Sequence, residues 1–94
     1  MAVVTSTELI QIARKNGWLL PAYNTTNMEM TLGILDGLQR AGMPGILQIA
    51  PTNVKLSDYG MIASIVKRAA EDYNVPTCLH LDHGKTLEDV RQAV

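Results

Sequence analysis

The chain has 94 residues, 47% hydrophobic and 18% charged, which is typical of a globular domain and excludes a disordered one. A net charge of −1 and a pI of about 6.0 give no general basic field, so neither nucleic acid nor an anionic membrane is an expected partner. The one cysteine, Cys78, cannot form an internal disulfide, and the sequence has the pattern of neither a signal peptide nor a membrane span. We therefore expect one cytoplasmic domain over residues 1–94.

The first signals along the chain predict a short helix over about residues 6–16. Thr5 and Glu8 have the spacing of a capping box, and Gly17 supplies a stop. The apolar run 18–23 then predicts a strand, although Pro21 within it cannot donate a backbone hydrogen bond.

A second helix is predicted after Asn27, which can cap it. Its apolar positions recur at helical spacing from Met28 to Leu38, and Gly42 and Pro44 end it. Residues 45–50 are nearly continuous apolar sequence, which is typical of a parallel strand buried on both faces.

The third helix has the strongest periodicity, from Tyr59 to Tyr73, with Ser57 or Asp58 as its cap. A third strand follows over residues 77–82. Its alternation predicts leucines 79 and 81 on the helix side and Cys78, His80 and Asp82 on the other. Thr86, with Asp89 three residues later, begins a fourth helix that continues to the last residue.

The order of elements is a helix followed by three βα units, which predicts an α/β fold with a parallel sheet and right-handed crossovers. Polar residues on the side of the third strand away from its helix favour a barrel over a doubly wound sheet. We therefore expect the first three βα units of a (β/α)8 TIM barrel, a fold of about 250 residues, preceded by a short N-terminal helix. Two strand edges would be unpaired.

Chemistry in α/β proteins collects at the carboxyl ends of the strands, where this chain places Asp82 and His83. An imidazole can bind zinc, and a carboxylate beside it can act as an acid or base. The alternative is that Asp82 caps the next helix and His83 is an exposed loop residue. Spacing alone favours this alternative.

Other polar residues near these ends have two interpretations each. His80 fits an interior, hydrogen-bonded histidine better than a ligand, and Cys78 fits a small buried apolar residue. Lys85 could bind a phosphate but fits a solvated side chain better. Asn24, Thr25 and Asn27 could bind substrate hydroxyls or cap the following helix. The methionines at 28, 30, 43 and 61 are expected in the core.

The block His80-Leu81-Asp82-His83-Gly84 resembles the class II fructose-bisphosphate and tagatose-bisphosphate aldolase family. The resemblance extends over essentially the whole chain. It includes residues 6–8, Ala22-Tyr23-Asn24, Asn27-Met28-Glu29, residues 44–48 and Val75-Pro76.

The resemblance implies a (β/α)8 barrel that reversibly cleaves a phosphorylated ketose, fructose 1,6-bisphosphate, into dihydroxyacetone phosphate and glyceraldehyde 3-phosphate. It implies that Asp82 is the catalytic acid/base, that His83 is one of three histidine ligands of Zn²⁺, and that Asn24 lies near the substrate. Zinc would act as a Lewis acid that stabilises the enediolate. His80 matches the motif without being a ligand, and a homo-oligomer is expected.

Two departures leave alternatives open. Ala50 stands where relatives generally have a Ser or Thr that helps to hold substrate, so tagatose 1,6-bisphosphate is an alternative substrate. His80 and His83 are the only two histidines, and a catalytic zinc site needs three protein ligands. The alternative function is a non-catalytic partial barrel that self-associates or needs a partner fragment, which the uncapped helix end near Val94 and the two open strand edges favour.

Overall fold

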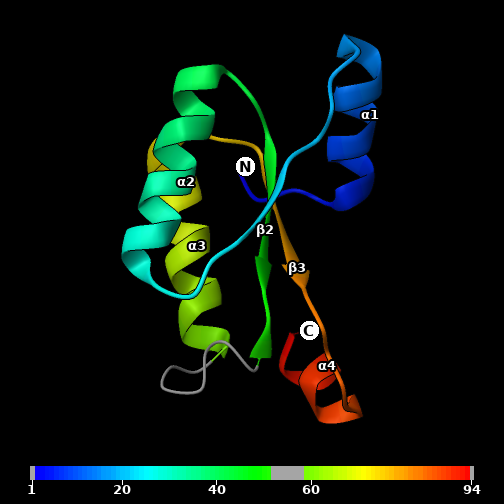
Figure 1. The fold of residues 1–94 in the computed structure, drawn as a ribbon, viewed down its shortest axis with the longest axis vertical. Coiled ribbons are helices and arrows are strands. Elements are labelled where there is room, and N and C mark those ends of the chain that lie inside the picture. Colours follow the sequence, from blue (N-terminus) through cyan, green and yellow to red (C-terminus); the bar gives the residue numbers. More distant parts are fainter. Residues whose placement is uncertain (1, 52–58, 94) are drawn as a thin grey trace.

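The computed structural model describes residues 2–51 and 59–93 and has the alternating helices and strands that the sequence predicts (Figure 1). The elements in chain order are α1 (Ser6–Asn16), β1 (Ala22–Asn24), α2 (Met28–Ala41), β2 (Gly45–Ile49), α3 (Tyr59–Tyr73), β3 (Thr77–Leu81) and α4 (Leu87–Ala93). The predicted α/β class is confirmed. The predicted caps at Ser57 or Asp58, and Val94 at the end of the last helix, lie outside the described residues.

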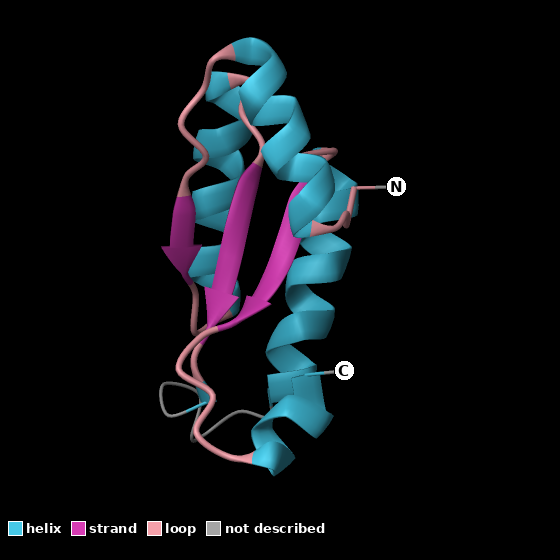
Figure 2. Ribbon diagram, turned by 90° about the vertical axis from the view of Figure 1, so that its right-hand side faces the viewer, coloured by secondary structure: helices cyan, strands magenta, loops and turns pink. Residues whose placement is uncertain are grey.

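The three strands form one parallel sheet in the order β1-β2-β3. Helices α2 and α3 lie side by side on one face of the sheet, whereas α1 lies on the opposite side near the amino ends of the strands (Figures 1 and 2). Helix α4 follows β3 beyond its carboxyl end and contacts α3. All three strands therefore end on the same side of the molecule (Figure 2).

The hydrophobic core lies between the sheet and the pair α2 and α3. Leu47 and Ile49 of β2 are fully buried there, together with Leu35 of α2 and Val66 of α3. Burial of such a side chain contributes roughly 1.5–3 kcal/mol. Leu79 and Leu81 pack against this core from β3, so the predicted helix side of that strand is confirmed.

The predicted helix ends of α1 and α2 are confirmed in detail. Thr5 Oγ1 accepts a hydrogen bond from the Glu8 backbone N–H at 3.2 Å, and the Thr5 N–H donates to Glu8 Oε2 at 2.7 Å. Asn27 Oδ1 accepts from the Met30 N–H at 2.8 Å. Gly17 and Gly42 end the two helices in the left-handed conformation, with φ of 69° and 67°.

The first strand is shorter than the predicted 18–23. Pro21 precedes β1, where its carbonyl oxygen accepts from the Ile46 N–H at 2.9 Å, but its ring nitrogen has no proton to donate. Regular pairing therefore starts at Ala22. Trp18 and Leu19 are exposed and lie outside the strand.

Two burial predictions were wrong. In β2, Leu47 and Ile49 are buried against α2 and α3, but Ile46 and Gln48 are only half-buried, because α1 lies on their side of the sheet near the amino ends of the strands alone (Figure 1). Of the four methionines expected in the core, only Met43 packs against it. Those at 28, 30 and 61 are exposed.

The N-terminal segment covers the start of β3, which the sequence did not predict. The Thr77 N–H donates to the Ala2 carbonyl oxygen at 2.7 Å, and the Val4 N–H donates to the Thr77 carbonyl oxygen at 2.9 Å. The outer edge of β3 is therefore paired at its start. Across the described ranges, no helix has the length and apolar character needed to cross a bilayer.

Candidate functional site

The carboxyl ends of the three strands bring together polar side chains that are far apart in the sequence. Asn24 ends β1, Gln48 lies one residue before the end of β2, and Asp82 follows β3 directly. Asn24, Gln48 and His80 occupy one register level of the sheet, so their side chains project from the same face. This face is the one opposite α2 and α3.

Two hydrogen bonds connect these side chains. Asn24 Nδ2 donates to Asp82 Oδ2 at 2.9 Å, and Gln48 Nε2 donates to Asn24 Oδ1 at 3.2 Å. The Asp82 backbone N–H donates to the Ile49 carbonyl oxygen at 3.0 Å, which fixes the start of the loop. Asn24 and Asp82 are therefore direct partners, although β2 lies between their strands.

His83 is turned toward the same end of the sheet by its backbone. It has a φ of 55°, in the left-handed region that few residues other than glycine adopt. Strand alternation would send neighbouring side chains to opposite faces, but this turn brings His83 Nε2 to 3.7 Å from Asp82 Oδ2. The His83 side chain is 76% exposed and that of Asp82 only 21%.

Asp82 does not cap the next helix, which was the alternative interpretation. Thr86 and Asp89 cap α4: the Asp89 N–H donates to Thr86 Oγ1 at 3.1 Å, and the Lys85 and Thr86 N–H groups donate to Asp89 Oδ2. The Lys85 N–H, followed by the Thr86 groups, lowers the pKa of Asp89 below its usual value. Asp82 is thus free of a capping role.

The other candidates lie in less reactive surroundings. Thr25 is fully buried and shares a 2.7 Å hydrogen bond with Thr31 Oγ1, so it has a structural role. Asn27 is the helix cap. Burial raises the pKa of the Cys78 thiol, which fits the predicted small buried residue. His80 is exposed, so the predicted interior, hydrogen-bonded histidine was wrong. Helix α1, on the same face of the sheet, lies near the amino ends of the strands and leaves His80 uncovered (Figure 1).

Comparisons with known proteins identify a family for this chain. The family description "Fructose-bisphosphate aldolase class-II" matches residues 4–94. The chain belongs to the class II fructose-bisphosphate aldolase family. A fructose-bisphosphate aldolase of Giardia intestinalis is 35% identical over 95 residues, a match that covers all of this chain and 29% of that protein.

Solved aldolase structures share the fold. The YdjI aldolase of Escherichia coli K12 superposes with a TM-score of 0.85 at 22% identity, covering 97% of this chain and 36% of that one. The fructose-bisphosphate aldolase of Campylobacter jejuni gives a TM-score of 0.81 at 24% identity, covering 97% of this chain and 32% of that one. The chain therefore spans about a third of the length of these TIM-barrel relatives, and the predicted fold is confirmed.

The described residues fit one part of a zinc site. His83 offers an exposed imidazole, the ligand type that catalytic zinc prefers, at the end of the sheet where aldolase chemistry is expected. In residues 2–51 and 59–93, no group of three His, Cys, Asp or Glu side chains lies close enough together to hold a metal ion. A catalytic zinc site would therefore need further ligands from outside the described residues.

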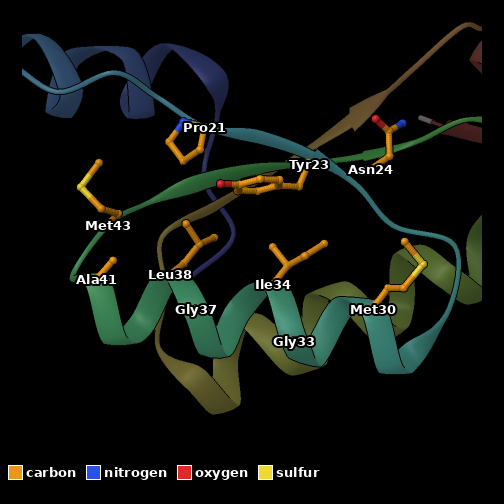
Figure 3. A pocket seen from close by; sticks show the side chains of 10 residues that line it. All are labelled: Pro21, Tyr23, Asn24, Met30, Gly33, Ile34, Gly37, Leu38, Ala41 and Met43. Carbon is orange, nitrogen blue, oxygen red and sulfur yellow. The ribbon is translucent and has the colours of Figure 1, made fainter.

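An apolar pocket lies on another side of the molecule, between β1 and α2 (Figure 3). Its volume is about 670 Å³, and the Tyr23 ring lies over the side of α2 that carries Gly33, Ile34 and Gly37. The pocket is mainly apolar, and of the Asn24–Asp82–His83 cluster only Asn24 borders it. It therefore lacks the acid, base or metal ligand that cleavage of a carbon–carbon bond requires.

Gln48 is the site residue that sequence reasoning missed. It stands in an otherwise apolar strand, two residues before Ala50, and was counted with a strand buried on both faces. The sequence did contain a signal for it, because a single polar residue within an apolar strand often has a specific partner. Ala50 itself is buried beside the strand end and provides no hydroxyl.

Proposed function

We propose that this chain provides the acid/base residue and one metal ligand of a zinc-dependent aldolase. The reaction is the reversible cleavage of fructose 1,6-bisphosphate into dihydroxyacetone phosphate and glyceraldehyde 3-phosphate. The observation that carries the proposal is the cluster of Asn24, Asp82 and His83 at the carboxyl ends of three parallel strands. Family membership supports an aldol reaction in particular.

Asp82 has the properties of a proton acceptor for this reaction. Cleavage breaks the bond between C3 and C4 of the ketose. The C4 hydroxyl loses its proton and becomes the aldehyde, and the electron pair passes to C3 and toward the C2 carbonyl. Oδ2 of Asp82 is held by Asn24, and Oδ1 has no hydrogen-bond partner among the described residues. Oδ1 is therefore the atom that can accept the hydroxyl proton.

Asn24 and His83 have supporting roles in the proposal. Asn24 fixes the Asp82 carboxylate and, as its hydrogen-bond partner, would lie beside the substrate hydroxyl that Asp82 meets. His83 provides an imidazole for Zn²⁺, and bound zinc would supply a positive charge that stabilises the negative charge developing on the substrate. The complete active site requires a whole (β/α)8 barrel, to which residues 1–94 contribute a partial barrel.

Two alternatives have specific support. Ala50 lacks the hydroxyl that the family resemblance leads one to expect, which leaves tagatose 1,6-bisphosphate or another phosphorylated ketose open as the substrate. The open β1 edge and exposed apolar residues such as Leu19 favour a non-catalytic partial barrel that binds itself or a partner fragment. A homo-oligomer is compatible with each of them.

The test is an aldol-cleavage assay on the protein as its native host makes it, with fructose and tagatose 1,6-bisphosphate as substrates. We expect cleavage of one of them, lost on treatment with a chelator and restored by zinc. Comparable rates before and after complete zinc removal would contradict the proposed metal dependence. The absence of cleavage of both sugars by the zinc-loaded protein would favour the non-catalytic alternative.

A further inference from the structure

We propose that Gln48 is a positioning residue, which orients the Asn24 amide so that Asn24 can hold the Asp82 carboxylate. This inference rests on the proposed role of Asp82. Its basis is the row of three side chains, one from each strand end, connected by hydrogen bonds of 3.2 Å and 2.9 Å.

The direction of both hydrogen bonds follows from the chemistry of the groups. An ionised carboxylate only accepts hydrogen bonds, so the Asn24 end that faces Asp82 must be the NH₂ group. The Asn24 carbonyl oxygen then faces Gln48, which must present its own NH₂ group. If the Asn24 amide rotated by half a turn, two acceptors would meet at Asp82 and two donors at Gln48.

The Asn24 side chain must extend from β1 to Asp82 after β3, so its amide needs a neighbouring side chain to hold it in this orientation. Asn24 and Asp82 belong to β1 and β3, and two strand spacings separate these strands by roughly 9.5 Å. The Asn24 side chain therefore extends across the face of β2 that is opposite α2 and α3, where Gln48 is its neighbour at the same register level. Beyond it, Ala50 presents only a methyl group at the end of β2. Among the described residues, Gln48 is the one side chain that holds the Asn24 oxygen.

The consequence concerns which Asp82 oxygen meets the substrate. Asn24 occupies Oδ2, so Oδ1 is the oxygen left for the substrate hydroxyl. Loss of the Gln48 donor would leave the Asn24 amide free to rotate and the carboxylate free to turn. Substrate binding would change little, but fewer complexes would have the proton acceptor in place, so kcat should fall more than KM rises.

The test compares two Gln→Met substitutions in the protein as its native host makes it. Gln48→Met keeps the side-chain length and removes the donor. Gln39→Met is the matched control, because Gln39 Nε2 also makes one hydrogen bond, 2.8 Å long, to the Tyr73 carbonyl oxygen between α2 and α3. We expect Gln48→Met to lower kcat by about 10–100-fold, with a much smaller change in KM, and Gln39→Met to leave both unchanged. Gln48→Glu should be at least as impaired, because a carboxylate cannot donate.

A second measurement does not depend on activity. The side-chain NH₂ resonances of Asn24 report its hydrogen bonds, and they should move in Gln48→Met but not in Gln39→Met. Unchanged Asn24 resonances, or a kcat for Gln48→Met equal to that of the unsubstituted protein, would overturn the role of Gln48. If the unsubstituted protein cleaves no ketose bisphosphate, the proposed function fails, and the NMR comparison still decides whether Gln48 orients Asn24.

Discussion

At the scale of single residues, His83 combines an unusual backbone with a side chain that can bind metal. Asparagine tolerates the left-handed conformation but lacks the imidazole. We therefore expect His83→Asn to keep the free energy of unfolding and to lose bound zinc. His83→Val should lose zinc and also about 1–2 kcal/mol of stability, because a β-branched side chain is strained at a φ of 55°. Metal analysis and urea unfolding of both variants provide the measurement, and full zinc content in His83→Asn would contradict the ligand role.

Asp89 makes a pH-dependent contribution at the start of α4. The Lys85 N–H, followed by the Thr86 groups, lowers its pKa, so the folded state binds this proton less readily than the unfolded state. The capping interaction is therefore complete above the ordinary carboxyl pKa and is lost as the pH falls through the lower folded value. A carboxyl NMR titration should place Asp89 below 3.8, together with a loss of α4 structure on acidification. A midpoint at or above that value would contradict the cap.

Among the site residues, position at the strand ends made Asp82, His83 and Asn24 candidates, but spacing alone favoured other roles. The family resemblance singled out these three residues, and the structure brings them together. Their roles remain predictions. Gln48 was missed because its importance depends on the register between β1 and β2, which one sequence does not reveal.

At the scale of elements, the glycines of α2 differ in what they do. Gly37 lies in the helix interior beside the open pocket, and a Cβ there would meet no atom within 4 Å. We expect Gly37→Ala to raise the free energy of unfolding by about 1 kcal/mol through helix propensity. Urea denaturation measures the change. A loss of stability would show that another part of the intact protein packs into the pocket.

Gly42 is the matched contrast to Gly37, at the end of the same helix. Its φ of 67° is strained for any residue with a Cβ, although here too a Cβ would have free space. Gly42→Ala should therefore lower the free energy of unfolding by about 1 kcal/mol, by backbone strain alone. If Gly37→Ala and Gly42→Ala changed the free energy of unfolding equally, helix propensity at Gly37 and backbone strain at Gly42 could not be the two causes.

The elements were predictable where local signals determine them. Capping residues and C-terminal glycines gave the bounds of α1 and α2 closely, because these interactions are made within a few residues. The predicted start of β1 was wrong, because Pro21 can accept a hydrogen bond in the sheet but has no backbone N–H to donate. The predicted burial of Met28, Met30 and Met61 was wrong, because helical periodicity does not say whether a second layer covers that face of the helix.

At the scale of the whole molecule, the chain has three strands of an aldolase fold and exposes apolar side chains and one strand edge. Leu19 is 93% exposed, Tyr23 is 48% exposed, and the β1 edge has no strand partner among the described elements. We expect the isolated 94-residue chain to self-associate in light scattering, to bind zinc weakly and to cleave no fructose 1,6-bisphosphate. A monomer with measurable cleavage would contradict the need for a complete barrel.

The central claim is that Asp82 accepts the proton from the substrate hydroxyl. Asp82→Asn tests it most directly, because the amide keeps the shape of the side chain and can still accept from Asn24. In the protein as its native host makes it, we predict that kcat for ketose bisphosphate cleavage falls by about 10²–10⁴-fold while bound zinc stays the same. An unchanged kcat in a zinc-loaded Asp82→Asn protein would contradict the assignment.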